Sequence, residues 1–190
     1  RAELRAALGI EVSEKVLLFV ANDVSNPRKG MKELMEAINT LKEDHLLICT
    51  VGNRMDEKTL NKKVKQFGFV KDEKKMAELY AMADIFILPS HAENFPNSII
   101  ESFLCGTPVI ASKVGGIPEQ VNEKNGILVE KGNAAELSAA IQDLLMKKEQ
   151  MSGEEIRKAA LTIYGTELIV KRHLEVYKDA IDRSSSAEKY

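Results

Sequence analysis

Residues 84–104 read DIFILPSHAENFPNSIIESFL, and this segment indicates how the whole chain is built. The uninterrupted apolar run at 85–88, closed by Pro89, is typical of a strand buried on both faces. Residues 98–104 follow a helical pattern that ends near Gly106. The connecting loop therefore lies at the C-terminal end of a strand, which in an open α/β sheet is the edge where ligands bind.

The same alternation of apolar runs and helical patterns extends along most of the chain. We expect further strands at residues 15–21, 46–51, 67–70, 107–112 and 126–129. Helical patterns occupy residues 31–41, 56–64, 72–83, 134–146, 153–161 and 167–181. Apolar strands separated by helices indicate a parallel sheet covered on both faces, and right-handed crossovers make it doubly wound. We therefore predict an α/β fold with about six parallel strands and a helical C-terminus, in one domain spanning residues 1–190.

The composition argues against several classes of function. A net charge of -2 over 190 residues provides no general attraction to nucleic acid or to an anionic membrane. No apolar run is long enough for a transmembrane segment, and no signal-peptide pattern opens the sequence. The two cysteines, Cys49 and Cys105, are expected to be buried thiols rather than a disulfide or a metal pair.

A basic loop follows the first expected strand. Arg28 and Lys29 precede Gly30 at the start of a helical pattern. Lysine and arginine supply donors to phosphate, and a helix N-terminus adds free N–H groups and a favourable dipole. The alternative is a solvated pair of surface charges. The position after strand one, on the same sheet edge as Glu93, favours a phosphate site.

Two carboxylates, Glu93 and Glu101, flank the turn between the strand at 85–88 and the next helix. Carboxylates accept hydrogen bonds from sugar hydroxyls, whereas a diphosphate would sit on the backbone N–H groups near Asn97 and Ser98. A nucleotide sugar carries both kinds of group, hydroxyls on its two sugars and a diphosphate between them. The alternative is that both glutamates are ordinary exposed charges.

A run of motifs strengthens the first interpretation, because together they resemble the retaining glycosyltransferases of family 4, which have the GT-B fold. The similarity is to their C-terminal, donor-binding, Rossmann-like domain, and it covers roughly residues 15–145. The motifs are Pro89-Ser90, Glu93-Asn94-Phe95-Pro96, Glu101-Ser102-Phe103, Gly106-Thr107-Pro108-Val109-Ile110-Ala111-Ser112, Gly115-Gly116-Ile117-Pro118-Glu119 and Asn125-Gly126-Ile127-Leu128-Val129.

The resemblance implies a role for each candidate residue. Glu93 would contact the donor hexose near the reacting carbon, and Lys29 would neutralise the diphosphate leaving group, so these two are the predicted catalytic residues. Glu101 would hold the ribose hydroxyls. The other predicted donor-binding residues are Arg28, Val70 (along the base), Asn94, Phe95, Pro96, Asn97 and Ser98. The implied donor is a UDP-, GDP- or ADP-sugar, with no metal and no cofactor.

The sequence departs from the family pattern at two places. The family usually carries an arginine just after the first strand, where this chain has Ala21-Asn22-Asp23, and Arg28 is the candidate replacement. Asn94 stands where a glycine is more usual; asparagine tolerates left-handed backbone angles better than most residues.

The resemblance further implies what the full-length protein does. We expect a retaining, metal-independent hexosyltransferase of polysaccharide biosynthesis, whose saccharide or lipid-linked acceptor binds an N-terminal domain absent from these 190 residues. The isolated chain should then bind donor weakly and transfer sugar slowly or not at all. The expected location is cytoplasmic, with a peripheral position on the inner membrane face left open.

Two alternatives stay open, namely a sugar-nucleotide epimerase or phosphorylase of related fold, and a non-catalytic nucleotide-sugar-binding module. The donor base and sugar, the acceptor and the oligomeric state are not readable from the sequence. The helix from Glu167 onward is expected to pack on the absent domain, leaving an exposed apolar patch around Ile169, Leu174 and Val176.

Overall fold

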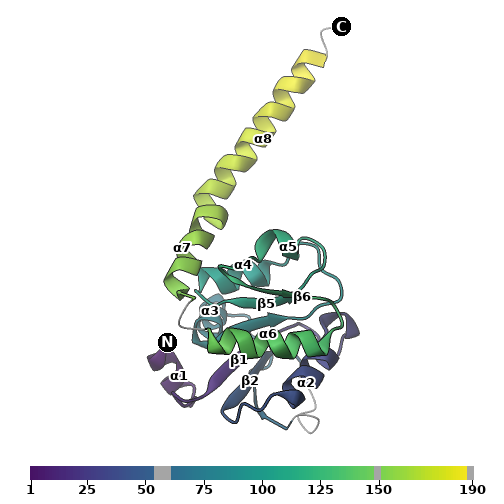
Figure 1. Ribbon diagram of the computed structural model, residues 1–190. Coiled ribbons are helices and arrows are strands. Elements are labelled where there is room, and N and C mark those ends of the chain that lie inside the picture. The colour runs from purple at the N-terminus through teal and green to yellow at the C-terminus, as the bar shows by residue number, and fades with distance from the viewer. Residues whose placement is uncertain (54–60, 148–150, 188–190) are drawn as a thin grey trace.

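The computed structural model describes residues 1–53, 61–147 and 151–187, and its centre is a six-stranded parallel sheet (Figure 1). The strand order β3-β2-β1-β4-β5-β6 reverses direction between β1 and β4. Ligands bind at such a switch point in open α/β sheets. The strands are β1 (Lys15–Val20), β2 (Leu46–Val51), β3 (Lys63–Gln66), β4 (Ile85–Leu88), β5 (Val109–Ser112) and β6 (Gly126–Val129).

Helices cover both faces of this sheet. On one face α2 packs against α6, and on the other α3 lies between α1 and α4 while α7 packs on α4 (Figure 1). The prediction of a Rossmann-like, doubly wound α/β fold is therefore confirmed. The helices are α1 (Ala2–Ala7), α2 (Met31–Thr40), α3 (Glu73–Met82), α4 (Asn97–Leu104), α5 (Ile117–Gln120), α6 (Ala134–Met146), α7 (Gly153–Tyr164) and α8 (Thr166–Ala187), with a 3₁₀ turn, η1, at Pro27–Lys29.

The core divides into two apolar clusters, one under each helical layer. Along β1, Leu18 faces the cluster beneath α3 and α4, whereas Leu17 and Phe19 face the cluster beneath α2 and α6. Successive side chains of a strand point to opposite faces, so a strand buried on both sides must be apolar throughout. This is why the uninterrupted apolar runs located β1, β2 and β4 correctly.

The third strand was predicted wrongly. The structure places β3 at Lys63–Gln66 and leaves residues 67–70 in the loop that follows, so Val70 lies beyond the strand end. β3 is an edge strand with partly exposed residues, and edge strands accept charged side chains. The helix predicted at 56–64 is contradicted at residues 61–64, and its first residues, 56–60, lie outside the described part of the chain.

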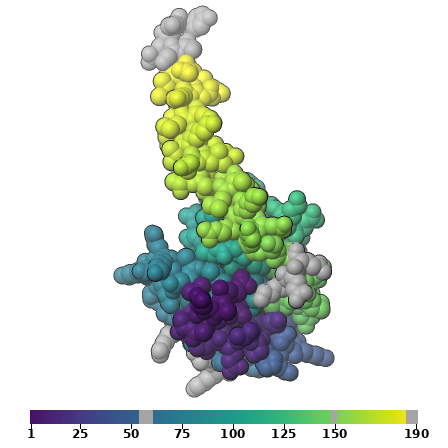
Figure 2. Space-filling model, turned by 90° about the vertical axis from the view of Figure 1, so that its left-hand side faces the viewer, coloured from purple at the N-terminus to yellow at the C-terminus, as the bar shows by residue number. Residues whose placement is uncertain are grey.

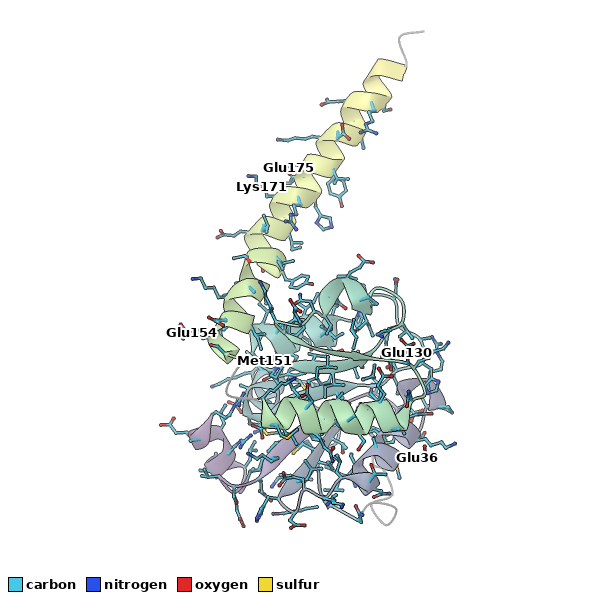
Figure 3. All side chains as sticks on the ribbon, viewed as in Figure 1. Glu36, Glu130, Met151, Glu154, Lys171 and Glu175 are labelled. Carbon is cyan, nitrogen blue, oxygen red and sulfur yellow. The ribbon has the colours of Figure 1, made fainter. Side chains whose placement is uncertain are left out.

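Helix α8 projects from the body of the molecule (Figures 1 and 2). Lys171 and Glu175 lie on its projecting part (Figure 3). Leu174 is 52% exposed and Val176 is 65% exposed, whereas Ile169 is half-buried. Leu174 and Val176 are exposed as expected, but residues two positions apart on a helix point to opposite sides, so these two do not form one patch. Within the described ranges, no helix combines the length and apolar character that crossing a bilayer requires.

Candidate functional site

Lys29 is positioned by the loop between β1 and α2. The side chain of Asn26 accepts a hydrogen bond from the N–H of Arg28 at 3.0 Å, which caps the η1 turn. Gly30 then adopts a left-handed conformation with φ 72°, and a Cβ there would lie 2.0 Å from the carbonyl oxygen of Pro89. Only glycine lets the loop press this closely on the end of β4.

The loop after β4 is tied to the same place. The N–H of His91 donates to the carbonyl oxygen of Arg28 at 2.8 Å. The ring Nε2 of His91 lies 3.1 Å from Oε1 of Glu33, in the first turn of α2. Two loops that are distant in the sequence are thus joined across the switch point between β1 and β4, and His91 serves as a connector between them.

The two predicted catalytic residues meet where these loops join. Lys29 Nζ lies 2.8 Å from Glu93 Oε1, and Ser90 Oγ donates a hydrogen bond to the same oxygen at 2.8 Å. The side chains are partly shielded, with 32% of Lys29 and 15% of Glu93 exposed. The sequence predicted that Lys29 and Glu93 share one sheet edge, but it did not predict their direct contact or the hydrogen bond from Ser90.

A pocket of about 400 Å³ opens beside this ion pair. Its size falls in the range of small-molecule sites. Four predicted site residues line it, Arg28, Lys29, Glu93 and Asn94, together with Asn26 and Ala92. The pocket therefore carries two cations and one carboxylate, a combination suited to a phosphate joined to a hydroxyl-bearing group.

Backbone packing holds the loop that carries Glu93. The carbonyl oxygen of Asn94 accepts from the N–H of Gly116 at 2.6 Å. A Cβ on Gly115, whose φ is 53°, would lie 2.0 Å from the carbonyl oxygen of Glu93. Phe95 packs on Gly116, where a Cβ would lie 2.8 Å from its ring. Gly115 and Gly116 belong to one of the motifs of the family resemblance, but the sequence did not predict their close contact with residues 93–95.

The N-terminus of α4 completes this edge. Pro96 occupies the N-cap position, and no side chain in the described part of the chain caps the helix. Asn97 is exposed and Ser98 is half-buried, so the first turn lies near solvent. Uncapped N–H groups at a helix start favour an anion. Gln120 supports the turn, because its Nε2 donates to the carbonyl oxygen of Pro96 at 3.2 Å.

The remaining predicted residues lie outside the lining of the pocket beside Lys29. Glu101 is exposed on α4, about one turn beyond the helix start, and Val70 is half-buried against the cluster under α3 and α4. Burial raises the pKa of the Tyr80 phenol, and the negative charge of Glu101 raises it further. Tyr80 therefore stays protonated beneath Glu101 at neutral pH.

The site of the family's usual arginine has its own local structure. Oδ1 of Asp23 accepts hydrogen bonds from the N–H and Oγ of Ser25, at 3.0 and 2.6 Å, and from Nδ2 of Asn53 at 2.8 Å. These hydrogen bonds lower the pKa of the Asp23 carboxyl, and the one from the Ser25 hydroxyl has the largest effect. Arg28 is exposed and lines the pocket, so its guanidinium is the cation available to assist Lys29.

Residues 14–147 match the family model described as glycosyl transferases group 1. The chain belongs to the group 1 glycosyltransferases. It is 29% identical over 191 residues to N-acetyl-alpha-D-glucosaminyl L-malate synthase of Bacillus anthracis, covering 94% of this chain and 49% of that protein. It is 32% identical over 160 residues to the D-inositol 3-phosphate glycosyltransferase of Mycobacteroides abscessus, covering 78% and 36%.

Solved structures of similar proteins agree with this family assignment. Sucrose-phosphate synthase from Thermosynechococcus elongatus superposes on this group 1 glycosyltransferase chain with a TM-score of 0.83 and 27% identity, over 96% of this chain and 49% of that one. Anabaena HepE in complex with UDP and glucose gives a TM-score of 0.78 and 25% identity, over 93% and 51%. The chain thus spans about half the length of these relatives.

Proposed function

We propose that this chain is the donor-binding half of a retaining glycosyltransferase and that it binds a nucleoside-diphosphate sugar at the β1–β4 switch point. The observation that carries the proposal is the ion pair between Lys29 and Glu93, which shares its sheet edge with the uncapped start of α4. Family membership supports transfer over the epimerase and phosphorylase alternatives.

Lys29 has the donors to serve two partners at once. An ammonium group carries three N–H bonds, and Glu93 takes one of them at 2.8 Å. The others are free to approach a phosphate oxygen while Glu93 holds the side chain in place. In the proposed reaction, Lys29 stabilises the negative charge that develops on the diphosphate as the glycosyl bond breaks.

Glu93 is proposed to accept hydrogen bonds from the hexose close to the reacting carbon. Ser90 orients the carboxylate by donating to Oε1, which leaves Oε2 as the oxygen available to the sugar. The amides of Asn97 and Ser98 would receive the diphosphate, and Glu101 would accept from the ribose hydroxyls. Arg28, Asn94, Phe95, Pro96 and Val70 would complete the donor site.

Several finer features remain proposals supported by the resemblance alone. These are retention of the anomeric configuration, independence of a metal ion and a role in polysaccharide biosynthesis. Product anomers read by NMR, and activity of the full-length enzyme in a chelator, test the first two. The expected cytoplasmic location, with a peripheral site on the inner membrane face, stays a prediction.

The rest of the full-length protein is proposed to supply the acceptor site. The relatives are about twice as long as this chain, and the exposed side chains of Val170, Leu174, Tyr177 and Ile181 recur at helical spacing along α8, forming a face suited to another structural unit. A saccharide or lipid-linked acceptor would bind to that other part of the full-length protein. The isolated chain would then bind donor without efficient transfer.

Calorimetric titration of the isolated chain tests donor binding. UDP-, GDP- and ADP-sugars are each titrated into the folded chain, with the matching nucleoside monophosphates as controls. Saturable binding of one diphosphate sugar, stronger than that of its monophosphate, is expected because Lys29 and the α4 amides would meet the second phosphate. Failure of the folded chain to bind any of the three would overturn the proposal.

A non-catalytic binding module is the second candidate, and Asp23 is the observation that favours it. Its carboxylate occupies the loop where the family usually carries a cation, and its hydrogen bonds to Ser25 and Asn53 keep it in place. Donor binding together with no sugar transfer by the full-length protein would support this candidate. Measurable transfer would exclude it.

A further inference from the structure

Tyr80 carries a hydroxyl group that the packing of the core does not require. The residue lies near the end of α3 with 1% of its surface exposed, and its ring packs edge-on against Phe86 with the centroids 5.3 Å apart. A phenylalanine would fill the same space. The phenol oxygen is shielded from solvent and makes no hydrogen bond of standard geometry within the described part of the chain. Because a buried hydroxyl without a partner is unfavourable, tyrosine at this position indicates a role beyond packing.

The carboxylate of Glu101 is the acceptor beside this phenol. Burial raises the pKa of Tyr80 most, and the negative charge and hydrogen-bonding oxygens of Glu101 raise it further. The thiol of Cys105 also lies nearby, but sulfur is a weak acceptor. Tyr80 therefore keeps its proton at neutral pH, and Glu101 is the strong acceptor to which it can donate.

Buried hydrogen bonds fix the position of Tyr80 relative to Glu101. Ser102, the residue after Glu101 on α4, donates from Oγ to the carbonyl oxygen of Thr107 at 2.9 Å. Thr107 donates from Oγ1 to the carbonyl oxygen of Tyr80 at 2.7 Å, and its N–H donates to the carbonyl oxygen of Ser102 at 3.0 Å. Both Ser102 and Thr107 are fully buried. The backbones of α3 and α4 are thereby held together where the phenol meets the carboxylate.

We propose that Tyr80 is a positioning residue for Glu101 and acts through it on ribose recognition. Its hydroxyl donates to one carboxylate oxygen of Glu101, so that the other oxygen stays directed to the ribose hydroxyls. A glutamate that is free on a helix surface loses rotamer freedom when it binds a ligand, and Tyr80 removes part of that entropic cost in advance. This role depends on the proposed donor site, in which Glu101 accepts from the ribose.

A double-mutant cycle measured by calorimetry tests the role of Tyr80. The ligand is whichever of UDP, GDP and ADP the wild-type chain binds most tightly. Tyr80→Phe should weaken binding by roughly three- to tenfold, but by less than about twofold when Glu101 is already alanine. Tyr164→Phe, which removes the hydroxyl of a half-buried tyrosine on α7, is the matched control and should leave the affinity unchanged. Equal losses in both backgrounds, or an unchanged affinity of Tyr80→Phe, would overturn the role.

NMR of the chain with labelled tyrosine rings tests the contact without any nucleotide. Glu101→Ala should shift the Cζ signal of Tyr80, whereas Glu167→Ala, at an exposed position on α8, should not. Circular dichroism verifies that both variants are folded. An unmoved Tyr80 signal in Glu101→Ala would show that the phenol and the carboxylate do not interact, and it would refute the positioning role.

The wild-type titration separates this role from the donor site itself. A folded wild-type chain that binds none of the three nucleotides would overturn the donor site, and the role of Tyr80 with it. Nucleotide binding by the wild type, together with a failed cycle or an unmoved Tyr80 signal, would overturn the role of Tyr80 alone.

Discussion

The ammonium of Lys29 lies 2.8 Å from Oε1 of Glu93, and this contact joins the loop after β1 to the loop after β4. The two residues are 64 positions apart in the chain. Their contact requires the β1–β4 pairing, the left-handed Gly30 against Pro89 and the hydrogen bond from His91 to Arg28. The topology of the sheet thereby brings two charged residues together in the lining of one pocket.

Lys29→Ala should weaken nucleoside-diphosphate binding by roughly ten- to hundredfold, because a charge-assisted hydrogen bond to phosphate is lost. Lys32→Ala is the matched control, since Lys32 is a nearby lysine on α2 with 83% of its side chain exposed. Calorimetry of both variants makes the comparison. Similar affinities for the two would exclude Lys29 from the phosphate site.

Glu93→Gln should separate sugar recognition from diphosphate recognition. Removing the carboxylate frees Lys29, so affinity for the nucleoside diphosphate should stay constant or rise. The added affinity that the hexose provides should fall, because a carboxylate accepts more strongly than an amide. The measurement compares UDP with UDP-glucose, or the corresponding pair for the preferred base. A loss confined to the diphosphate would contradict this role.

Glu101→Ala should reduce nucleotide affinity by roughly 1–3 kcal/mol, through lost hydrogen bonds to the ribose. The control is Glu167→Ala, an exposed glutamate on α8. A nucleotide lacking the 2′-hydroxyl sharpens the test, since it should narrow the difference between wild type and Glu101→Ala. If the difference between wild type and Glu101→Ala is the same with and without the 2′-hydroxyl, Glu101 does not form a hydrogen bond with that hydroxyl.

Gly115→Ala should destabilise the fold and disturb the Glu93 loop. Its φ is 53° and its Cβ would lie 2.0 Å from the Glu93 carbonyl oxygen. Gly9→Ala is the control, because Gly9 has a φ of 63° and nothing within 4 Å of the added Cβ. Both variants carry the left-handed strain, so the excess for Gly115→Ala, about 1–3 kcal/mol of unfolding free energy in urea, reports the clash. Equal destabilisation would show that the loop relaxes without strain.

The sequence predicted those parts of the fold that follow from local pattern. Buried strands such as β1 and β4 are apolar on both faces, so their position could be predicted from uninterrupted runs of apolar residues. β3 could not, because an edge strand that pairs on one side tolerates lysine at Lys63 and Lys65. Because β3 ends at Gln66, Val70 lies in the loop after the strand instead of at the end of the strand.

The candidate site, like the fold, could be predicted from the sequence only in part. Glu93 and Lys29 could be predicted to share an edge, since both follow strands of a parallel sheet. The support from Gly115 and Gln120 could not, because each acts through a close approach or a hydrogen bond to a residue of another loop. Ser90 acts within the Glu93 loop, three positions away, but its hydrogen bond depends on the fold of that loop. Only Ser90 has a local signal, as its hydroxyl directly follows the proline that ends β4.

A crystal structure of the chain with a bound nucleotide sugar tests the donor site most directly. We predict that the diphosphate contacts Lys29 Nζ and the amides of Asn97 and Ser98, with the hexose at Glu93 and the ribose at Glu101. Electron density for an ordered nucleotide sugar elsewhere on the molecule, with Lys29 still bound only to Glu93, would contradict this placement of the donor.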